Sequence, residues 1–301
     1  MSTTTQARPR LATTGQAPLR ALARIEAGRM LRSPAPWIGI ALWAGVNTLT
    51  LTQPASWPSS QYEELTTSAT YLCLGVSVAA AYAFGRERVN VSEEASMAAE
   101  ERAAARLLGG LSLVALVAAV VASGALWLRL RGGVAMGAEP GRTLHAHHTL
   151  PELLQPVLLA ALAVAVGAAV VHLVRHPLAA SIILFVGWFI VGPAYWVING
   201  PVLRWVAPLQ VQPLHVEAAA ASTDPFTLPA GWLLEGPGQF QDHWARLAVV
   251  PELAAWHDLY LVALTLLAAA VALPGRYRRR LAVVGASVAV VAVLLQASVT
   301  P

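Results

Sequence analysis

The sequence predicts an all-α membrane protein, a polytopic bundle of six core transmembrane helices with a seventh at the C-terminus. Hydrophobic residues make up 56% of its 301 residues and charged residues only 12%, whereas soluble domains carry about 25% charged residues. Seven apolar segments approach the roughly 20 residues that a helix needs to cross a bilayer. The arginines flank these segments, which is typical of membrane topology rather than of a nucleic-acid-binding stripe.

Composition divides the chain into three parts. Residues 1–17 are polar and have no apolar core, so we expect a disordered cytoplasmic tail and not a signal peptide. Residues 18–34 are basic, and their spacing suits an interfacial helix. Residues 35–299 are predicted to form the transmembrane domain.

The seven apolar segments are predicted to be helices, because strands of a membrane barrel would alternate in polarity every second residue over about 10 residues. The first and sixth segments are the shortest. The predicted spans are Trp37–Leu51, Ser68–Gly85, Leu107–Leu128, Leu153–Val174, Leu178–Ile198, His257–Leu273 and Leu281–Val299.

Arginine placement predicts the orientation. With the N-terminus in the cytoplasm, 15 of the 20 basic residues, all of them arginine, lie inside, as the positive-inside rule requires. An odd number of spans then places the C-terminus outside the cell membrane. The five arginines predicted outside are Arg129, Arg131, Arg142, Arg204 and Arg246.

Two long connections stand out between the spans. Residues 86–106 are cytoplasmic and rich in Ala, Glu and Arg, and Asn90 and Glu93 have capping-box spacing, so a helix is expected there. Residues 199–256 form an external loop with seven prolines. Its apolar stretches, Val202–Leu209 and Trp232–Leu234, are expected to form short interfacial or re-entrant helices.

The residue types in the chain exclude several chemistries. A Walker-type phosphate loop needs a lysine, and the sequence has none. HExxH and GxSxG motifs are also absent, so no enzyme activity is expected. The predicted span interiors hold no Asp or Glu, which disfavours a proton- or sodium-coupled carrier. The energy for any transport is therefore expected to come from another chain.

One candidate metal site is the triplet His145, His147 and His148, because three imidazoles this close could hold zinc or copper. The alternative is a solvated polar loop without metal. The single cysteine, Cys73, lies in an apolar segment and is expected to be inert.

Three stretches, residues 21–40, 85–106 and 256–280, resemble the permease subunits of type-2 ABC exporters, particularly actinobacterial ones. The resemblance implies that the first stretch is an elbow helix with Arg20, Arg24, Glu26, Arg29 and Arg32. Arg20 and Arg24 are opposite Leu22 and Ile25 on this predicted helix. The second stretch would couple the permease to its ATPase through Arg86, Glu87, Arg88, Asn90, Glu93, Glu94, Glu100, Glu101 and Arg102.

The resemblance also implies the partners. Two permease chains, identical or related, would pair in the bilayer with two ATPase subunits, which would bind ATP and magnesium; this chain would hold no cofactor and bind no nucleic acid. The second and fifth spans would line the dimer interface and a path for an apolar or amphipathic substrate, with Thr70, Tyr71, Ser77 and Tyr195. The alternative is a non-transporting membrane scaffold or sensor subunit, and an intramembrane enzyme is disfavoured.

Overall fold

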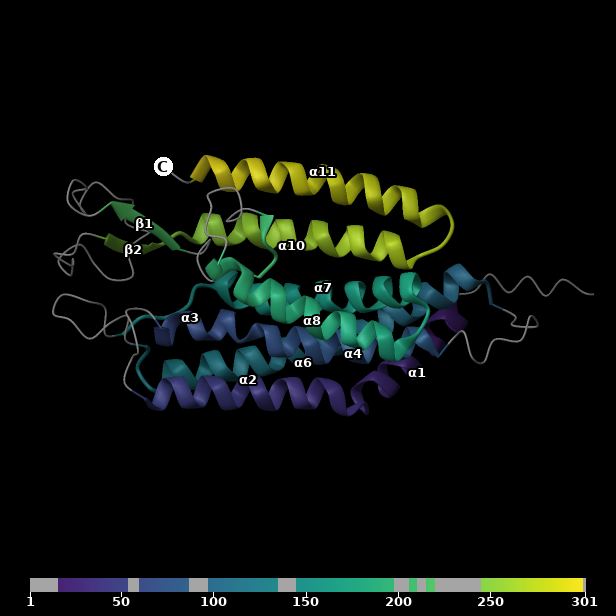
Figure 1. Cartoon of the computed structure of the whole chain (residues 1–301), viewed down its shortest axis with the longest axis horizontal. Coiled ribbons are helices and arrows are strands. Elements are labelled where there is room, and N and C mark those ends of the chain that lie inside the picture. Colours follow the sequence, from purple (N-terminus) through teal and green to yellow (C-terminus); the bar gives the residue numbers. More distant parts are fainter. Residues whose placement is uncertain are drawn as a thin grey trace, which may run out of the picture.

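The computed structural model describes residues 16–53, 60–86, 97–134, 145–197, 206–209, 215–219 and 245–299. These residues form long helices that run along one common axis, with two short strands at one end (Figure 1). The elements are α1 (Gln16–Leu31), α2 (Pro34–Thr52), α3 (Ser60–Thr67), α4 (Ala69–Gly85), α6 (Ala99–Leu130), α7 (Leu150–Val174), α8 (Pro177–Val197), β1 (His215–Ala219), β2 (Ala245–Val249), α10 (Pro251–Ala272) and α11 (Arg276–Val299).

The chain is a multi-pass α-helical membrane protein. Among the described residues, five segments are long and apolar enough to cross a bilayer: Gln61–Gly85, which joins α3 to α4, then α6, α7, α10 and most of α11. Each of the seven predicted spans coincides with a helix, because α2 and α8 occupy the other two.

Helix α7 lies at the centre of the bundle and packs against α4, α6, α8 and α10. Helix α4 also contacts α2 and α8, and α1 lies along α6. Helix α11 forms an antiparallel hairpin with α10 and packs chiefly along that helix, at the edge of the bundle (Figure 1). The predicted second and fourth spans are therefore the two innermost helices.

Small residues allow these helices to approach closely, as is usual in membranes, where packing replaces the hydrophobic drive of water. A Cβ atom on Gly39 of α2 would lie 2.5 Å from the carbonyl oxygen of Tyr71 in α4. A Cβ atom on Gly75 would lie 2.5 Å from the carbonyl oxygen of Ala35. These two reciprocal contacts fix α2 directly against the backbone of α4.

The two ends of the bundle differ in composition. Helix α1, the start of α6 and the α10–α11 turn lie at one end, whereas β1, β2, α3 and the start of α7 lie at the other (Figure 1). The first end is rich in arginine, and we call it the basic end. Its described arginines are Arg20, Arg24, Arg29, Arg32, Arg86, Arg102, Arg106, Arg175, Arg276, Arg278, Arg279 and Arg280.

The loop predicted at 199–256 differs from its prediction. Strands β1 and β2 pair antiparallel within it, with His215 opposite Val249, and α10 begins at Pro251, six residues before the predicted sixth span. Of the stretch Val202–Leu209, residues 206–209 are described, and only Val206 is helical. The predicted helix at Trp232–Leu234 lies outside the described residues. Alternation over five residues is too short a signal to distinguish such strands from loop.

Candidate functional site

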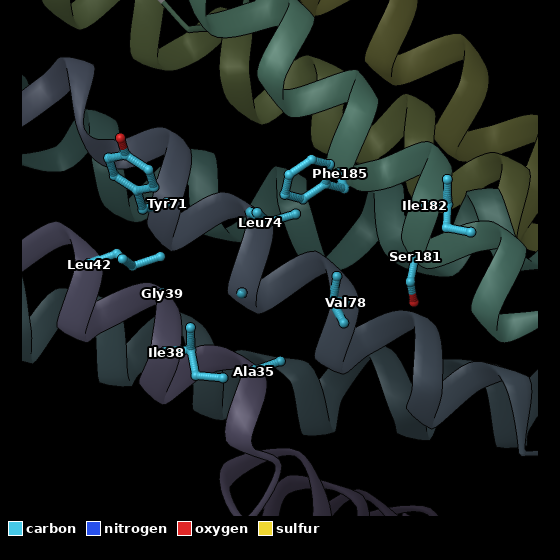
Figure 2. A pocket seen from close by; sticks show the side chains of 11 residues that line it. Ala35, Ile38, Gly39, Leu42, Tyr71, Leu74, Val78, Ser181, Ile182 and Phe185 are labelled. Atoms are coloured by element: carbon cyan, nitrogen blue, oxygen red, sulfur yellow. The ribbon is translucent and has the colours of Figure 1, made fainter.

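An apolar groove lies between α2, α4 and α8 and has a volume of about 330 Å³ (Figure 2). Helix α4 forms its floor, and α2 and α8 form its walls. The lining residues are Ala35, Ile38, Gly39 and Leu42 from α2, Tyr71, Leu74, Gly75 and Val78 from α4, and Ser181, Ile182 and Phe185 from α8.

The close contact between α2 and α4 shapes the groove. Because Gly39 and Gly75 have no side chains, α2 lies against the backbone of α4 and leaves its neighbouring side chains to form a wall. The opposite wall projects from α8, where Phe185 stacks on Phe189 with ring centroids 4.8 Å apart. The groove is thus built by backbone packing on one side and aromatic packing on the other.

The groove offers almost no polar group to a ligand. Ser181 donates its hydroxyl to the carbonyl oxygen of Pro177 in its own helix at 2.8 Å. None of the described residues that line the groove is charged. Its walls are open, since Ile38 and Ile182 are each 57% exposed. Such a surface can accept a hydrocarbon chain, an apolar ring or an apolar helix.

The structure describes the side chains of three of the four predicted path residues. Tyr71 lines the groove, and Thr70 is half-buried beside it in sequence. Ser77 is fully buried and accepts a hydrogen bond from Trp188 Nε1 at 3.1 Å, so this hydroxyl joins α4 to α8. The side chain of Tyr195 lies outside the described residues. Periodicity alone does not show which face of α4 meets α8.

The predicted coupling segment is described only in part. Arg86 follows the end of α4, and the first turn of α6 contains Glu100, Glu101 and the adjoining Arg102. Arg102 donates to the carbonyl oxygen of Met97. The other predicted coupling residues, Glu87, Arg88, Asn90, Glu93 and Glu94, lie outside the described residues.

Helix α6 is longer than a span needs. Its 32 residues extend about 48 Å at 1.5 Å per residue, whereas the hydrocarbon core is about 30 Å thick. Its charged first turns lie at the basic end, and its apolar part is the third predicted span. The first turns of α6 therefore extend the bundle beyond the bilayer on the arginine-rich side.

The predicted elbow segment is a helix, α1, which lies along α6. The protein buries the Glu26 side chain, which is 3% exposed, whereas Ile25 on the predicted apolar face is 52% exposed. Arg29 pairs with Glu26 at 3.0 Å, and Gly109 of α6 lies against the Glu26 side chain. Amphipathic spacing alone does not indicate the face of α1 that meets α6. The remaining predicted elbow residues, Arg20, Arg24 and Arg32, are exposed.

A buried polar cluster joins α3 to the start of α7 at the end opposite the basic end. Tyr62 donates to the Glu152 carboxylate, with its hydroxyl 2.9 Å from Oε1 and 3.0 Å from Oε2. The backbone N–H and the hydroxyl of Thr149 each donate to Glu152 Oε2 at 2.7 Å. Glu152 is fully buried. The predicted spans placed this carboxylate outside the bundle, although Thr149 and Glu152 have the capping-box spacing that predicts a helix start.

The three histidines of the predicted metal site serve separate contacts. His148 is buried, and its ring stacks on Tyr62 with centroids 4.1 Å apart. Its Nε2 lies 2.9 Å from the Tyr62 carbonyl oxygen, so Nε2 carries a proton. Burial lowers the pKa of His148. His145 Nδ1 faces the Gly132 carbonyl oxygen at 2.8 Å.

These contacts change the interpretation of the loop. His147 is exposed, but the solvated loop expected for all three histidines is wrong for His148, which stacks inside the protein. Within the described part of the chain, no group of three His, Cys, Asp or Glu residues has metal-binding geometry.

A second buried cluster lies between α10, α11 and residues 206–209. His257 Nε2 is 3.3 Å from the Pro208 carbonyl oxygen, and Nδ1 is 3.1 Å from Gln296 Oε1. Both partners are acceptors, and a neutral imidazole has only one N–H, so the ring donates to one of these two oxygens. Tyr260 donates to the Val206 carbonyl oxygen at 2.8 Å. The cluster therefore fastens residues 206–209 to the hairpin.

Asp258 is the second residue of the predicted sixth span. It is only 8% exposed and lies well inside α10. Its Oδ1 has no hydrogen-bond partner among the described residues. Together with Glu152, it shows that the spans do contain buried carboxyl groups.

No protein-family model matches this sequence, and no curated protein matches it either. The functional interpretation therefore rests on the residues of the chain, the groove and the resemblance stated above.

Proposed function

We propose that this chain is the membrane-spanning permease subunit of an exporter driven by separate ATPase subunits, and that it handles an apolar or amphipathic substrate. The observation that carries the proposal is the groove between α2, α4 and α8, which is open and almost free of polar groups. A channel for ions or sugars would need charged or hydrogen-bonding groups in its lining.

The basic end supports the need for a partner. The chain has no lysine for a Walker motif, and α6 carries charged turns beyond the bilayer thickness. Glu101 is exposed there. A short charged helix end of this kind can pair with a polar groove on an ATPase and transmit its movement to the bundle. The chain would lie in the cell membrane, with the N-terminus and the basic end facing the cytoplasm.

The partner is tested by affinity purification of the full chain from membranes of its native host in mild detergent. We expect an ATP-hydrolysing subunit with a Walker motif to copurify. Glu101→Arg should reduce its recovery several-fold, because the reversal places like charges at the docking surface. Glu252→Arg is the matched control, since Glu252 is exposed in the first turn of α10 at the opposite end. If no ATPase copurifies with the unchanged chain, the scaffold or sensor alternative takes its place.

The groove is tested separately. Val78→Trp should fill the groove floor and reduce the export of an apolar dye from cells by at least several-fold. Val291→Trp is the control, because Val291 is 49% exposed on α11, away from the groove. Equal export by both variants would show that the groove does not carry substrate.

A further inference from the structure

The start of α11 concentrates positive charge in an unfavourable place. Arg276, Arg278, Arg279 and Arg280 fall within five residues, and the first turn contains no acidic residue. A helix N-terminus carries a partial positive charge, so arginines there repel the helix dipole unless an anion lies nearby. Tyr277 and the three arginines after it are exposed.

Two of these arginines lie above the face of α11 that the protein does not cover. Helix α11 meets α10 through Gly285. A Cβ atom added to Gly285 would lie 3.0 Å from the Ala263 carbonyl oxygen. On the other face, Val283 and Val284 are 58% and 50% exposed. Arg279 and Arg280 precede these valines by four residues, one helical turn, and therefore share their face.

The described part of the chain shows no counter-ion for this pair, because Arg279 and Arg280 form no ion pair there. The carboxylate of Glu100 lies against Gly275, four residues before Arg279, and so belongs to the turn and not to the exposed face. Among the described residues, these two guanidinium groups are therefore open to an anion from outside the chain.

We infer that Arg279 and Arg280 form a docking surface for the phosphate headgroups of anionic phospholipids. The apolar run 281–299 begins immediately after them, so their guanidinium groups lie at headgroup depth when the exposed valines lie among acyl chains. Guanidinium groups bind phosphate oxygens in a bidentate manner. A phospholipid satisfies both parts of this face, whereas a free phosphate ion satisfies only the arginines.

This inference does not depend on the proposed transport function. It also explains how an edge helix that packs chiefly along one neighbour is held in position. The lipid headgroups would hold the basic end of α11 in place, and α10 would hold the rest of the helix by packing along it.

The test is native mass spectrometry of the full-length protein in neutral detergent, titrated with phosphatidylglycerol or phosphatidylcholine. We expect the unchanged protein to retain phosphatidylglycerol preferentially. Each arginine near an anionic headgroup contributes about a factor of five in affinity. Arg279→Gln combined with Arg280→Gln should therefore weaken phosphatidylglycerol binding about 30-fold, and raising the salt concentration should weaken binding to the unchanged protein.

Two matched variants complete the design. Arg129→Gln with Arg131→Gln removes the same charge from exposed positions at the end of α6, away from the basic end, and should leave binding unchanged. Arg279→Lys with Arg280→Lys keeps the charge and should retain most of the binding. The inference is overturned if both glutamine variants lose binding equally, if neither loses it, or if soluble glycerol phosphate displaces the lipid at equal concentration.

Discussion

The reciprocal glycine contact between α2 and α4 gives a prediction whose size can be worked out from the structure. In Gly39→Ala, the new methyl group would lie 2.5 Å from the Tyr71 carbonyl oxygen and 3.3 Å from the Gly75 Cα atom. Ordinary contacts of this kind are about 3.4 Å or longer, so α2 must move away from α4 by roughly 1 Å. Overpacking of this kind costs about 1–3 kcal/mol.

A second glycine in the same helix isolates that cost. Gly45 has no atom within 4 Å of an added Cβ, so Gly45→Ala creates no clash. Both substitutions gain about the same helix propensity, up to about 1 kcal/mol in water. This gain cancels in the difference between the two variants. We therefore expect Gly39→Ala to be less stable than Gly45→Ala by about 1–3 kcal/mol.

The measurement is unfolding of each full-length variant in mixed detergent micelles, followed by tryptophan fluorescence, because Trp37 and Trp43 lie in α2 itself. A difference in the free energy of unfolding below about 0.5 kcal/mol would refute the reasoning, since it is less than the lower bound for overpacking. Such a result would mean that α2 does not lie against α4 at Gly39.

Three further predictions concern the buried polar contacts, all measured by the same unfolding assay. Tyr62→Phe removes a donor to the buried Glu152 carboxylate and should cost about 2 kcal/mol; an unchanged stability would contradict the hydrogen bond. A double-mutant cycle of Trp188→Phe and Ser77→Ala should give a coupling energy of about 1 kcal/mol, because the two side chains share one hydrogen bond. Additive effects of the two substitutions on stability would contradict this hydrogen bond. Because burial lowers the pKa of His148, the unfolded chain takes up a proton first as the pH falls below about 6.5. Stability should therefore be constant above that pH and fall by up to about 1.4 kcal/mol by pH 5.5, and His148→Phe should remove this part of the slope.

The spans were predictable from the sequence because each needs only a run of apolar residues of sufficient length. All seven predicted segments coincide with helices, and the arginine-rich ends of these segments lie together at the basic end (Figure 1). The helix boundaries were less predictable. The predicted sixth span begins at the polar pair His257–Asp258. Helix α10 begins six residues earlier, at Pro251, because packing buries both polar side chains inside the helix.

The sequence does not predict which side chains meet at the helix interfaces. Apolar helices in a membrane have no polar face that shows which side meets a neighbour, so burial depends on shape. The sequence does not show that the Ser77 hydroxyl accepts a hydrogen bond from Trp188. Glu152 was left outside the bundle because its partner, Tyr62, is 90 residues away in the sequence. The groove itself depends on Gly39 and Gly75, which no pattern in the sequence distinguishes from the other glycines.

The central position of α7 has a consequence for biosynthesis. The ribosome makes α1, α2, α4 and α6 before α7, yet α4 buries one of its faces against α7 and another against α8. During synthesis, the Ser77 hydroxyl therefore lacks its Trp188 partner until that residue is made, more than 100 residues later. The N-terminal half cannot complete its packing alone, so premature termination after α6 would leave an unsatisfied helix in the bilayer, which membrane quality control can recognise.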